Sequence, residues 1–329
     1  VALTTPAQLA GITFNPDPTA YRSQFPSTAG GPLPSGASPV LVDPNFKFPQ
    51  VARLNIAADK RLGNGWSVTF EGIFNKDVNA IRMRNANQKD PDARFNGVDS
   101  RPRYSATGNG AAALALRRIY TALPTAIVLE NTNKGGGLQL STQLTKSFSK
   151  GFFATVAYTY TAMFDVTSNP GSTAASVWNS TATTTTQNDL QLGWANAAIP
   201  HRFIASTGYT FKYLKALATT VTLFYEGSPQ GNFSYVYQND MNGDGNAADL
   251  MYIPRNQSEI IFVPITGSTP FTAQQQWDAF NQFIENSSLK NRRGGYTNRN
   301  EALLPWVHNV NLQVQQDFNL NIGNRKHTF

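Results

Sequence analysis

The stretch DMNGDGNAAD at 240–249 holds the residues of this sequence best suited to binding a metal ion. Asp240, Asn242 and Asp244 stand at positions 1, 3 and 5, and Gly245 follows at position 6, which is the order of a calcium loop. Calcium prefers several hard oxygen ligands, and alternate Asp and Asn side chains supply them when a glycine turns the chain back. The spacing predicts a structural calcium site that stiffens the loop.

The end of this pattern departs from the usual calcium loop. Met251 stands at position 12, where a bidentate glutamate is normal, so Asp249 would have to contribute in its place. Asn246 would add its backbone carbonyl. The alternative is a polar turn without an ion, because Asn-Gly and Asp-Gly pairs favour turns by themselves. The sequence leaves both interpretations open.

No recognisable catalytic arrangement accompanies this loop. The chain has no cysteine, which excludes disulfides, thiolate metal sites and cysteine nucleophiles. The three histidines, His201, His308 and His327, stand at or near the starts of expected strands, without the spacing of a serine triad or a zinc protease. We therefore expect that the protein is not an enzyme.

The charged residues exclude one class of partner. The net charge is +7 at pH 7, but the lysines and arginines are scattered through loops and turns. A nucleic-acid-binding protein usually gathers such residues on one face. We therefore expect no nucleic-acid partner. No apolar run approaches the roughly 20 residues of a transmembrane helix.

The elements that must position these residues are β-strands. In FFATVAYTYTAMF (152–164) the even positions are apolar or aromatic, and the odd positions are mostly threonine and alanine. The same alternation recurs at 66–75, 138–145, 202–211, 221–226 and 306–318. A period of two predicts strands, each about 10–14 residues long.

The connections between the expected strands alternate between short and very long. Short turns stand at 61–65, 147–151, 212–216 and 319–325, and long connections at about 78–125, 166–200 and 228–305. Compact soluble domains rarely hold loops of that length. Outer-membrane barrels join their strands by short periplasmic turns and long extracellular loops. We expect residues 1–49 to be a further extracellular loop region and residues 50–329 to be a barrel segment.

The two faces of the expected strands suit two different surroundings. The even face, with Val156, Tyr158, Leu312 and Val314, would meet outer-membrane lipid, and the Thr, Ser, Asn and Gln of the other face would line a lumen. Aromatic residues near the strand ends would form belts at both membrane surfaces. A soluble sandwich, such as a calcium-dependent adhesin or lectin, would instead carry Lys and Glu outside.

Two glutamates fall on the expected lumen face. Glu71 and Glu226 stand at polar positions of their strands, where we expect them to pair with Arg202 or with residues of a plug. Paired charges of this kind are more ordinary in a barrel lumen than general acid–base catalysis.

The fold class predicted is all-β, an antiparallel up-and-down transmembrane β-barrel. A sheet in a bilayer cannot keep open edges. The pattern shows about eight strands, of which the last begins at Arg325 and reaches Phe329 after only five residues. Five residues cannot cross a membrane, so we expect part of a larger barrel.

One helix is expected inside the longest loop. TAQQQWDAFNQFIEN (272–286) begins with a Thr-x-x-Gln capping box at Thr272 and Gln275. The apolar residues that follow share one helical face: Trp277, Phe280, Phe283 and Ile284. We expect a short extracellular helix that packs this face against neighbouring loops, with a lid over a ligand or partner as the alternative.

Several long segments resemble one family, the Oar-like TonB-dependent outer-membrane receptors. They are VDPNFKFPQVARLNIAADKRL (42–62), FEGIFNKDVNAI (70–81), VLENTNKGG (128–136), AYTYTAMFDVTSN (157–169), LFYEGSPQGNFSYVYQNDMNGDGNAADLMYIP (223–254) and RRGGYTNRNEALLPW (292–306). The resemblance runs from about residue 40 to the end and is to the C-terminal part of the barrel.

This resemblance implies a location, a function and partners. The location is the bacterial outer membrane, and the function is uptake of a large solute through a barrel of 22 strands. The partners implied are a plug domain and TonB, which would be reached through an N-terminal region outside this sequence. The alternative is an outer-membrane surface or assembly protein that acts through its extracellular loops without import, with a surface protein or envelope polymer as partner.

Overall fold

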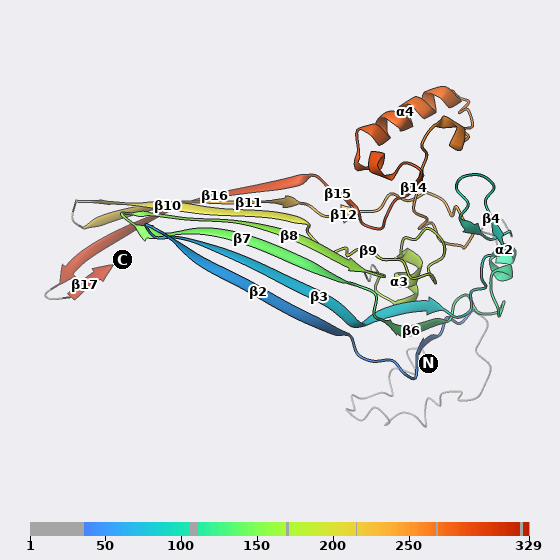
Figure 1. Cartoon of the computed structure of the whole chain (residues 1–329), viewed down its shortest axis with the longest axis horizontal. Coiled ribbons are helices and arrows are strands. Elements are labelled where there is room, and N and C mark those ends of the chain that lie inside the picture. The colour runs from blue at the N-terminus through green and yellow to red at the C-terminus, as the bar shows by residue number, and fades with distance from the viewer. Residues whose placement is uncertain are drawn as a thin grey trace, which may run out of the picture.

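The computed structural model describes residues 36–105, 111–168, 171–214, 216–267, 269–322 and 325–328. One long sheet runs along the molecule, and the helices and short strands gather at one end of it (Figure 1). Its principal strands are β2 (Gln50–Gly63), β3 (Trp66–Asn85), β7 (Gly136–Ser149), β8 (Phe152–Asp165), β10 (His201–Tyr213), β11 (Leu217–Pro229), β16 (Trp306–Ile322) and β17 (Arg325–Thr328).

The strand order confirms an antiparallel, up-and-down sheet. The neighbours are β2–β3, β3–β7, β7–β8, β8–β10, β10–β11, β11–β16 and β16–β17, and every pair is antiparallel. Strands β2 and β17 end this series, and within the described residues they do not pair with each other. The sheet is therefore open in the described part of the chain.

The register keeps the apolar positions of neighbouring strands opposite one another. Val156 of β8 faces Ala205 of β10, and Tyr225 of β11 faces Val310 of β16. On β16 the side chains of Leu312 and Val314 are 68% and 62% exposed. A soluble sandwich would cover such a face with a second sheet. The alternation read from the sequence is thus confirmed as a continuous apolar wall.

Tight turns join the long strands at the end away from the helices (Figure 1). Asn64 and Gly65 connect β2 to β3 with φ of 49° and 76°, and Lys150 and Gly151 connect β7 to β8 with φ of 52° and 87°. Positive φ at both central residues matches the right-handed twist of the flanking strands. Asn and Gly tolerate this conformation well, so the short-turn side forms from local sequence.

The first long connection starts later than the sequence pattern indicates. Strand β3 does not end near residue 78 but continues to Asn85, because its last part pairs with β6 (Ile127–Thr132). Strand β1 (Val40–Val42) then adds to β6 in parallel, so this corner of the sheet is not antiparallel. Residues 1–35 of the expected 1–49 loop region lie outside the described residues, as does Phe329.

The predicted loop helix is present as α4 (Ala273–Glu285). Gln275 donates its backbone N–H to Thr272 Oγ1 at 3.1 Å, and Thr272 donates its own to Gln275 Oε1 at 2.9 Å, which confirms the capping box. Ile284 is fully buried in a small core with Ile253 and Leu289. The burial of Ile284 therefore agrees with the expectation that this helix packs its apolar face against neighbouring loops.

Other short elements of the loop end were not predicted. They are α2 (Ala111–Leu116), α3 (Ala174–Ser180), the 3₁₀ helices η1 (Gln257–Glu259) and η2 (Ser288–Arg292), and the two-residue strands β4 (Ala93–Arg94), β5 (Pro102–Arg103), β9 (Gly193–Trp194), β12 (Asn232–Phe233), β13 (Tyr252–Ile253), β14 (Gly295–Tyr296) and β15 (Ala302–Leu303). Among the described residues, every helix is too short or too polar to cross a membrane.

Candidate functional site

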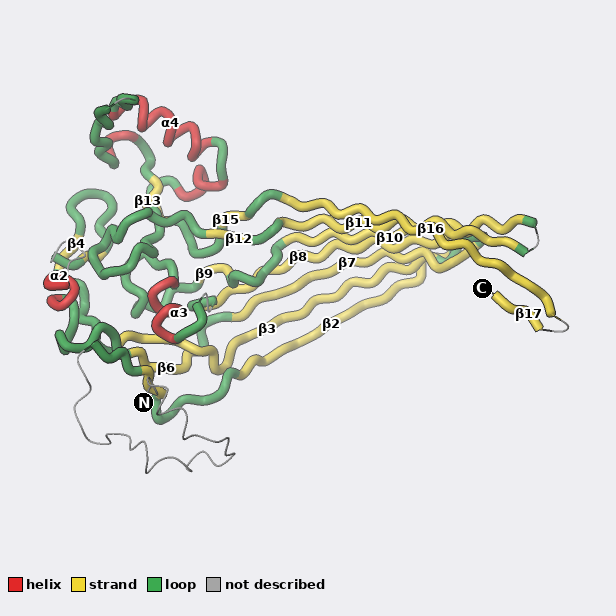
Figure 2. Tube along the Cα trace, turned by 180° about the vertical axis from the view of Figure 1, so that it is seen from behind, coloured by secondary structure: helices red, strands yellow, loops and turns green. Residues whose placement is uncertain are grey.

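The candidate site lies among the loops at the helix-bearing end of the sheet (Figure 2). Asn188 fixes this region, because its Oδ1 accepts hydrogen bonds from the backbone of Asn85, at the end of β3, and from the indole of Trp178 in α3, at 2.8 and 3.0 Å. Asn87 is 2% exposed and donates to the carbonyls of Tyr120 and Leu123. Polar side chains thus order the first long connection and join it to the second.

Asp240 organises the predicted calcium loop. Its carboxylate accepts the backbone N–H groups of Gly243, Asp244 and Gly245 at 2.6, 3.0 and 2.7 Å. The two glycines have φ of 80° and 98°, a left-handed conformation that other residues rarely adopt. The chain turns here because the Asp240 carboxylate accepts N–H groups that have no backbone partner in the turn. The two glycines permit the left-handed conformation that the turn needs.

Asn242 and Asp244 continue this pattern inside the loop. Asn242 Oδ1 accepts the N–H of Asp244 at 2.8 Å, and Asp244 Oδ1 accepts the N–H of Asn246 at 2.8 Å. Asn242 is 1% exposed and Asp244 is 7% exposed. The amide of Asn246 donates to Gln187 Oε1 at 3.1 Å, which joins the loop to the segment after α3.

Asp249 closes the loop against its own beginning. Its Oδ2 accepts the N–H of Met241 at 2.8 Å, and its side chain is buried, with 2% of the residue exposed. Its carbonyl accepts the N–H of Tyr237 at 2.9 Å. The structure therefore brings all five predicted residues into one turn: Asp240, Asn242, Asp244, Asn246 and Asp249.

The loop concentrates negative charge in a buried place. Burial, with the negative charge of Asp249 beside it, raises the pKa of Asp244 to about 7. Burial also raises the pKa of Asp249 to about 6, against hydrogen bonds from backbone N–H groups and the charge of Arg101, which lower it. Arg117 lies 3.6 Å from the Asp240 carboxylate, and both side chains are nearly inaccessible to solvent. A cation would relieve this crowding of carboxylates.

The calcium assignment stays a prediction. In the described part of the chain no three Asp, Glu, His or Cys side chains gather as closely as a metal site requires. In this conformation the oxygens of Asp240, Asn242 and Asp244 are occupied by backbone N–H donors.

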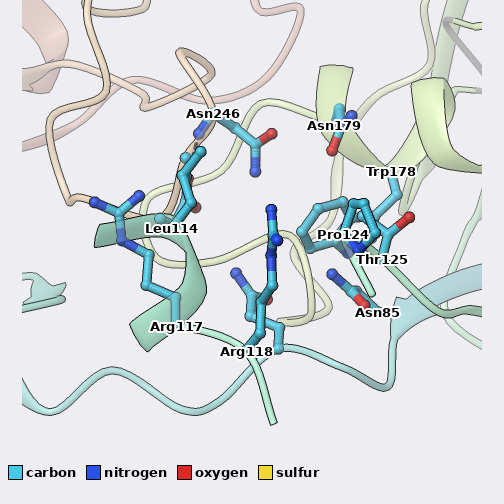
Figure 3. Close-up of a pocket in the computed structure, with 12 residues that line it drawn as sticks. Asn85, Leu114, Arg117, Arg118, Pro124, Thr125, Trp178, Asn179 and Asn246 are labelled. Carbon is cyan, nitrogen blue, oxygen red and sulfur yellow. Dashed lines mark hydrogen bonds between the residues drawn. The ribbon is translucent and has the colours of Figure 1, made fainter. Parts of the chain in front are cut away.

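A small pocket that the sequence did not indicate adjoins the 240–249 loop. Its volume is about 180 Å³. Figure 3 shows its lining from the end of β3, the residues after α2, helix α3 and the loop itself. The lining includes Asn85, Gln88, Arg117, Arg118, Trp178, Asn179, Asp244 and Asn246. These residues come from four separate parts of the chain, so no local motif could have revealed them.

Two of the three histidines lie in an aromatic group near the loop end of the apolar face. His201 Nδ1 is 2.7 Å from the hydroxyl of Tyr158, and His308 Nδ1 is 2.7 Å from that of Tyr225. The ring of Trp306 stacks with both histidines. This grouping suits an aromatic belt at the membrane surface. There the apolar part of each ring is buried and its polar atom can form a hydrogen bond. The side chain of His327 lies outside the described part.

The opposite face of the sheet is polar. Arg202 pairs with Glu226 at 2.7 Å, as the sequence predicted. Glu71 instead accepts a hydrogen bond at 2.9 Å from Asn55 of the adjacent strand. These side chains belong to the alternate positions of the strands, so they lie on the face opposite the apolar wall. Phe224 and Ile204 are apolar exceptions on this polar face, because they pair with Asn311 and Glu226.

Comparison with known proteins agrees with this architecture. The family model described as the outer membrane beta barrel domain matches residues 2–329. No curated protein and no solved structure matches the chain. The apolar wall, the polar opposite face and the one-sided loops are the features such a domain requires. The chain belongs to the outer membrane beta barrel domain family, and its location is the bacterial outer membrane.

Proposed function

We propose that this chain forms part of the barrel of a TonB-dependent receptor that takes up a large solute. The observation that carries the proposal is the ordered layer of loops above one end of the sheet. Buried polar contacts such as those of Asn188 and Asn87 hold this layer in a defined shape. A receptor needs such a preformed outer surface to select its solute. The Oar-like segments quoted above support the same function.

The open sheet supports a barrel larger than the described strands. Within the described residues strand β2 pairs on one side only, and its other edge there keeps unpaired N–H and C=O groups. Such an edge is very costly in lipid because no water is present to satisfy it. Further strands that pair with β2 would satisfy these groups, and the Oar-like resemblance supports a total of 22.

The polar face supports a plug domain as a partner. Arg53 donates to Asn75 at 2.8 Å, and Arg202 pairs with Glu226, so charged and amide groups line this side. In a plugged barrel such groups contact the plug and the water around it. TonB would reach the plug from the periplasm.

A second candidate function has an observation of its own. The segment from η1 through α4 to η2 forms a lobe that projects away from the sheet (Figure 1). Ile261 and Val263, between η1 and α4, are 92% and 76% exposed. Exposed apolar groups on an outer lobe favour contact with a surface protein or envelope polymer. On this alternative the protein acts through its loops without import.

We also propose that calcium binds the 240–249 loop and has a structural role. The buried carboxylates of Asp240, Asp244 and Asp249 support this, because an ion would offset their mutual repulsion. No catalytic role is proposed, since His201 and His308 both engage aromatic neighbours on the apolar face.

Crosslinking to TonB tests the transport proposal. The full-length protein in detergent would be mixed with the periplasmic domain of TonB that carries a photo-crosslinking residue. Energy coupling predicts crosslinks that disappear when the N-terminal segment of the full-length protein is removed. If none form with the intact protein, the surface-protein alternative is favoured.

Deletion of residues 257–293 then tests whether the α4 lobe is needed to capture a partner.

A further inference from the structure

The pocket beside the calcium loop has the composition of a binding subsite. Polar side chains dominate its lining, with amides at Asn85, Gln88, Asn179 and Asn246. Its volume is about 180 Å³, which is room for more than a few water molecules. A space of this size holds one small chemical unit of a larger solute.

Arg118 supplies a positive charge to this pocket. Figure 3 shows its side chain extending through the middle of the lining toward Asn246, with Leu114 on one side and Pro124 on the other. Among the described residues the Arg118 guanidinium makes no hydrogen bond or ion pair, whereas the neighbouring Arg117 lies 3.6 Å from Asp240. The five N–H donors of Arg118 therefore remain available to a ligand.

Gln88 lies beside Arg118 and has unmet hydrogen-bonding capacity. The two residues form an isolated antiparallel bridge through their backbones. Both Nε2 and Oε1 of Gln88 are buried, and neither has a hydrogen-bond partner in the described structure. Buried polar atoms nearly always find a partner, so each unsatisfied one needs an explanation. A ligand that both donates and accepts hydrogen bonds would satisfy this amide.

The chemistry of the lining narrows the class of ligand. A guanidinium binds a carboxylate through two parallel hydrogen bonds, and side-chain amides bind hydroxyl groups as donors and acceptors. Asp244 borders the same pocket, so each additional negative charge on the ligand would be repelled. A group with one negative charge and several hydroxyls fits better than a dianionic phosphate.

We propose that this pocket binds a carboxylate-bearing sugar unit of the solute, with Arg118 holding the carboxylate and Gln88 holding a hydroxyl. This assignment of a substrate class rests on the proposed role in solute uptake. Binding at the outer surface does not itself require TonB, so the two proposals are tested separately.

Calorimetry on the full-length protein in detergent tests the assignment. The probes are D-galacturonate, its neutral counterpart D-galactose, and inorganic phosphate. D-Galacturonate should bind saturably, and at least ten-fold more tightly than either of the others. Arg118→Gln and Gln88→Leu should each weaken binding at least ten-fold. Lys290→Gln removes one positive charge from an exposed position of η2, which does not line the pocket, and should leave the affinity unchanged.

Three outcomes would overturn the assignment. They are no saturable binding of D-galacturonate, equal binding of phosphate or D-galactose, and equal weakening by Arg118→Gln and Lys290→Gln. Heat-modifiable gel mobility identifies variants that remain folded, and Gln88→Leu provides a second test if Arg118→Gln assembles poorly.

Loss of TonB crosslinking with binding retained would count against uptake only. Retained crosslinking without binding would count against the sugar subsite only.

Discussion

Leu312 and Asn311 are neighbours in β16 whose side chains point to opposite faces of the sheet. Leu312 stands opposite Leu223 in the apolar wall, and Asn311 points to the polar side. Leu312→Arg places a charge against lipid and should cost roughly 2–4 kcal/mol of barrel stability near the midplane. Asn311→Arg should be tolerated better, because the lumen solvates the charge. Urea unfolding in lipid vesicles measures both.

Leu312→Arg and Asn311→Arg control for each other, because both introduce an arginine at adjacent positions of one strand. Its β-propensity and side-chain length are therefore the same in both variants, and a difference in stability reports the face of the sheet. If the two variants unfold at the same urea concentration, the apolar wall is not in contact with lipid. Val156→Arg in β8 repeats the test on a strand nearer the middle of the described sheet.

Gly137 is a residue at which only a hydrogen atom fits. A Cβ there would overlap the carbonyl oxygen of Ala162 on the adjacent strand β8. Gly137→Ala must push β7 and β8 apart and should destabilise the sheet by about 1–3 kcal/mol. Gly231→Ala is the control, since its Cβ would lie 3.6 Å from Leu304 Cδ1, an ordinary contact. Thermal loss of the heat-modifiable gel band reports the difference, and indistinguishable thermal midpoints would refute the close approach of the strands.

At the scale of an element, the 240–249 loop is the part most open to test. Asp240 alone accepts three backbone N–H groups, so Asp240→Ala should loosen the loop and raise its sensitivity to protease several-fold. Asp244→Ala should do the same if calcium binds. The membrane strands should stay assembled in both variants, because the loop lies beyond the ends of the long strands.

Chelation separates the two interpretations of this loop. If calcium binds, a chelator should raise protease sensitivity in the unmutated protein, and added calcium should reverse the effect there but not in Asp244→Ala. Extracellular calcium at millimolar concentration suits a weak site of this kind. Protease sensitivity that does not respond to chelator would leave an Asx-rich turn held only by its own hydrogen bonds.

The lobe that contains α4 shows how an element gains stability from its surroundings. The capping box at Thr272 starts the helix, but a helix of this length is marginal alone in water. Contacts of Ile284 with Ile253 and Leu289 supply the burial that holds it. The lobe can therefore project from the sheet and keep its shape.

At the scale of the whole molecule, the orientation in the membrane follows from the asymmetry of the connections. The tight turns lie at one end and the ordered loops at the other (Figure 1). Because this sequence holds no cysteine, single cysteines at Lys212 and Lys290 are specific labels. Both positions are exposed. An impermeant maleimide on intact cells should label position 290 and leave position 212 unlabelled until the outer membrane is opened.

Labelling of position 212 on intact cells would show that the orientation is the reverse of the one expected. It would place the short turns outside, and the pocket and the 240–249 loop in the periplasm. The sugar-subsite proposal would then lose its access to external solute. Equal labelling of both sites after disruption of the outer membrane confirms that both thiols are reactive.

The sequence by itself determined the strands, their faces and some of the turns. A period of two is a local property, and it fixed that Val156 and Tyr158 share a face of one strand and that Leu312 and Val314 share a face of another. The Asn64–Gly65 turn and the Thr272 cap depend on the chemistry of a few adjacent residues, so they too could be predicted. The 240–249 turn could be read from the sequence for the same reason, whereas calcium binding there stays a prediction.

Only the tertiary structure decided where β3 ends and how the long connections pack against one another. The extension of β3 to Asn85 depends on β6, which is some forty residues further along the chain. Helices α2 and α3 are too short to leave a helical period in the sequence. The pocket unites Gln88, Arg118 and Asn246, whose proximity comes from hydrogen bonds between separate connections. Such contacts have no fixed spacing along the chain, so folding alone brings these residues together.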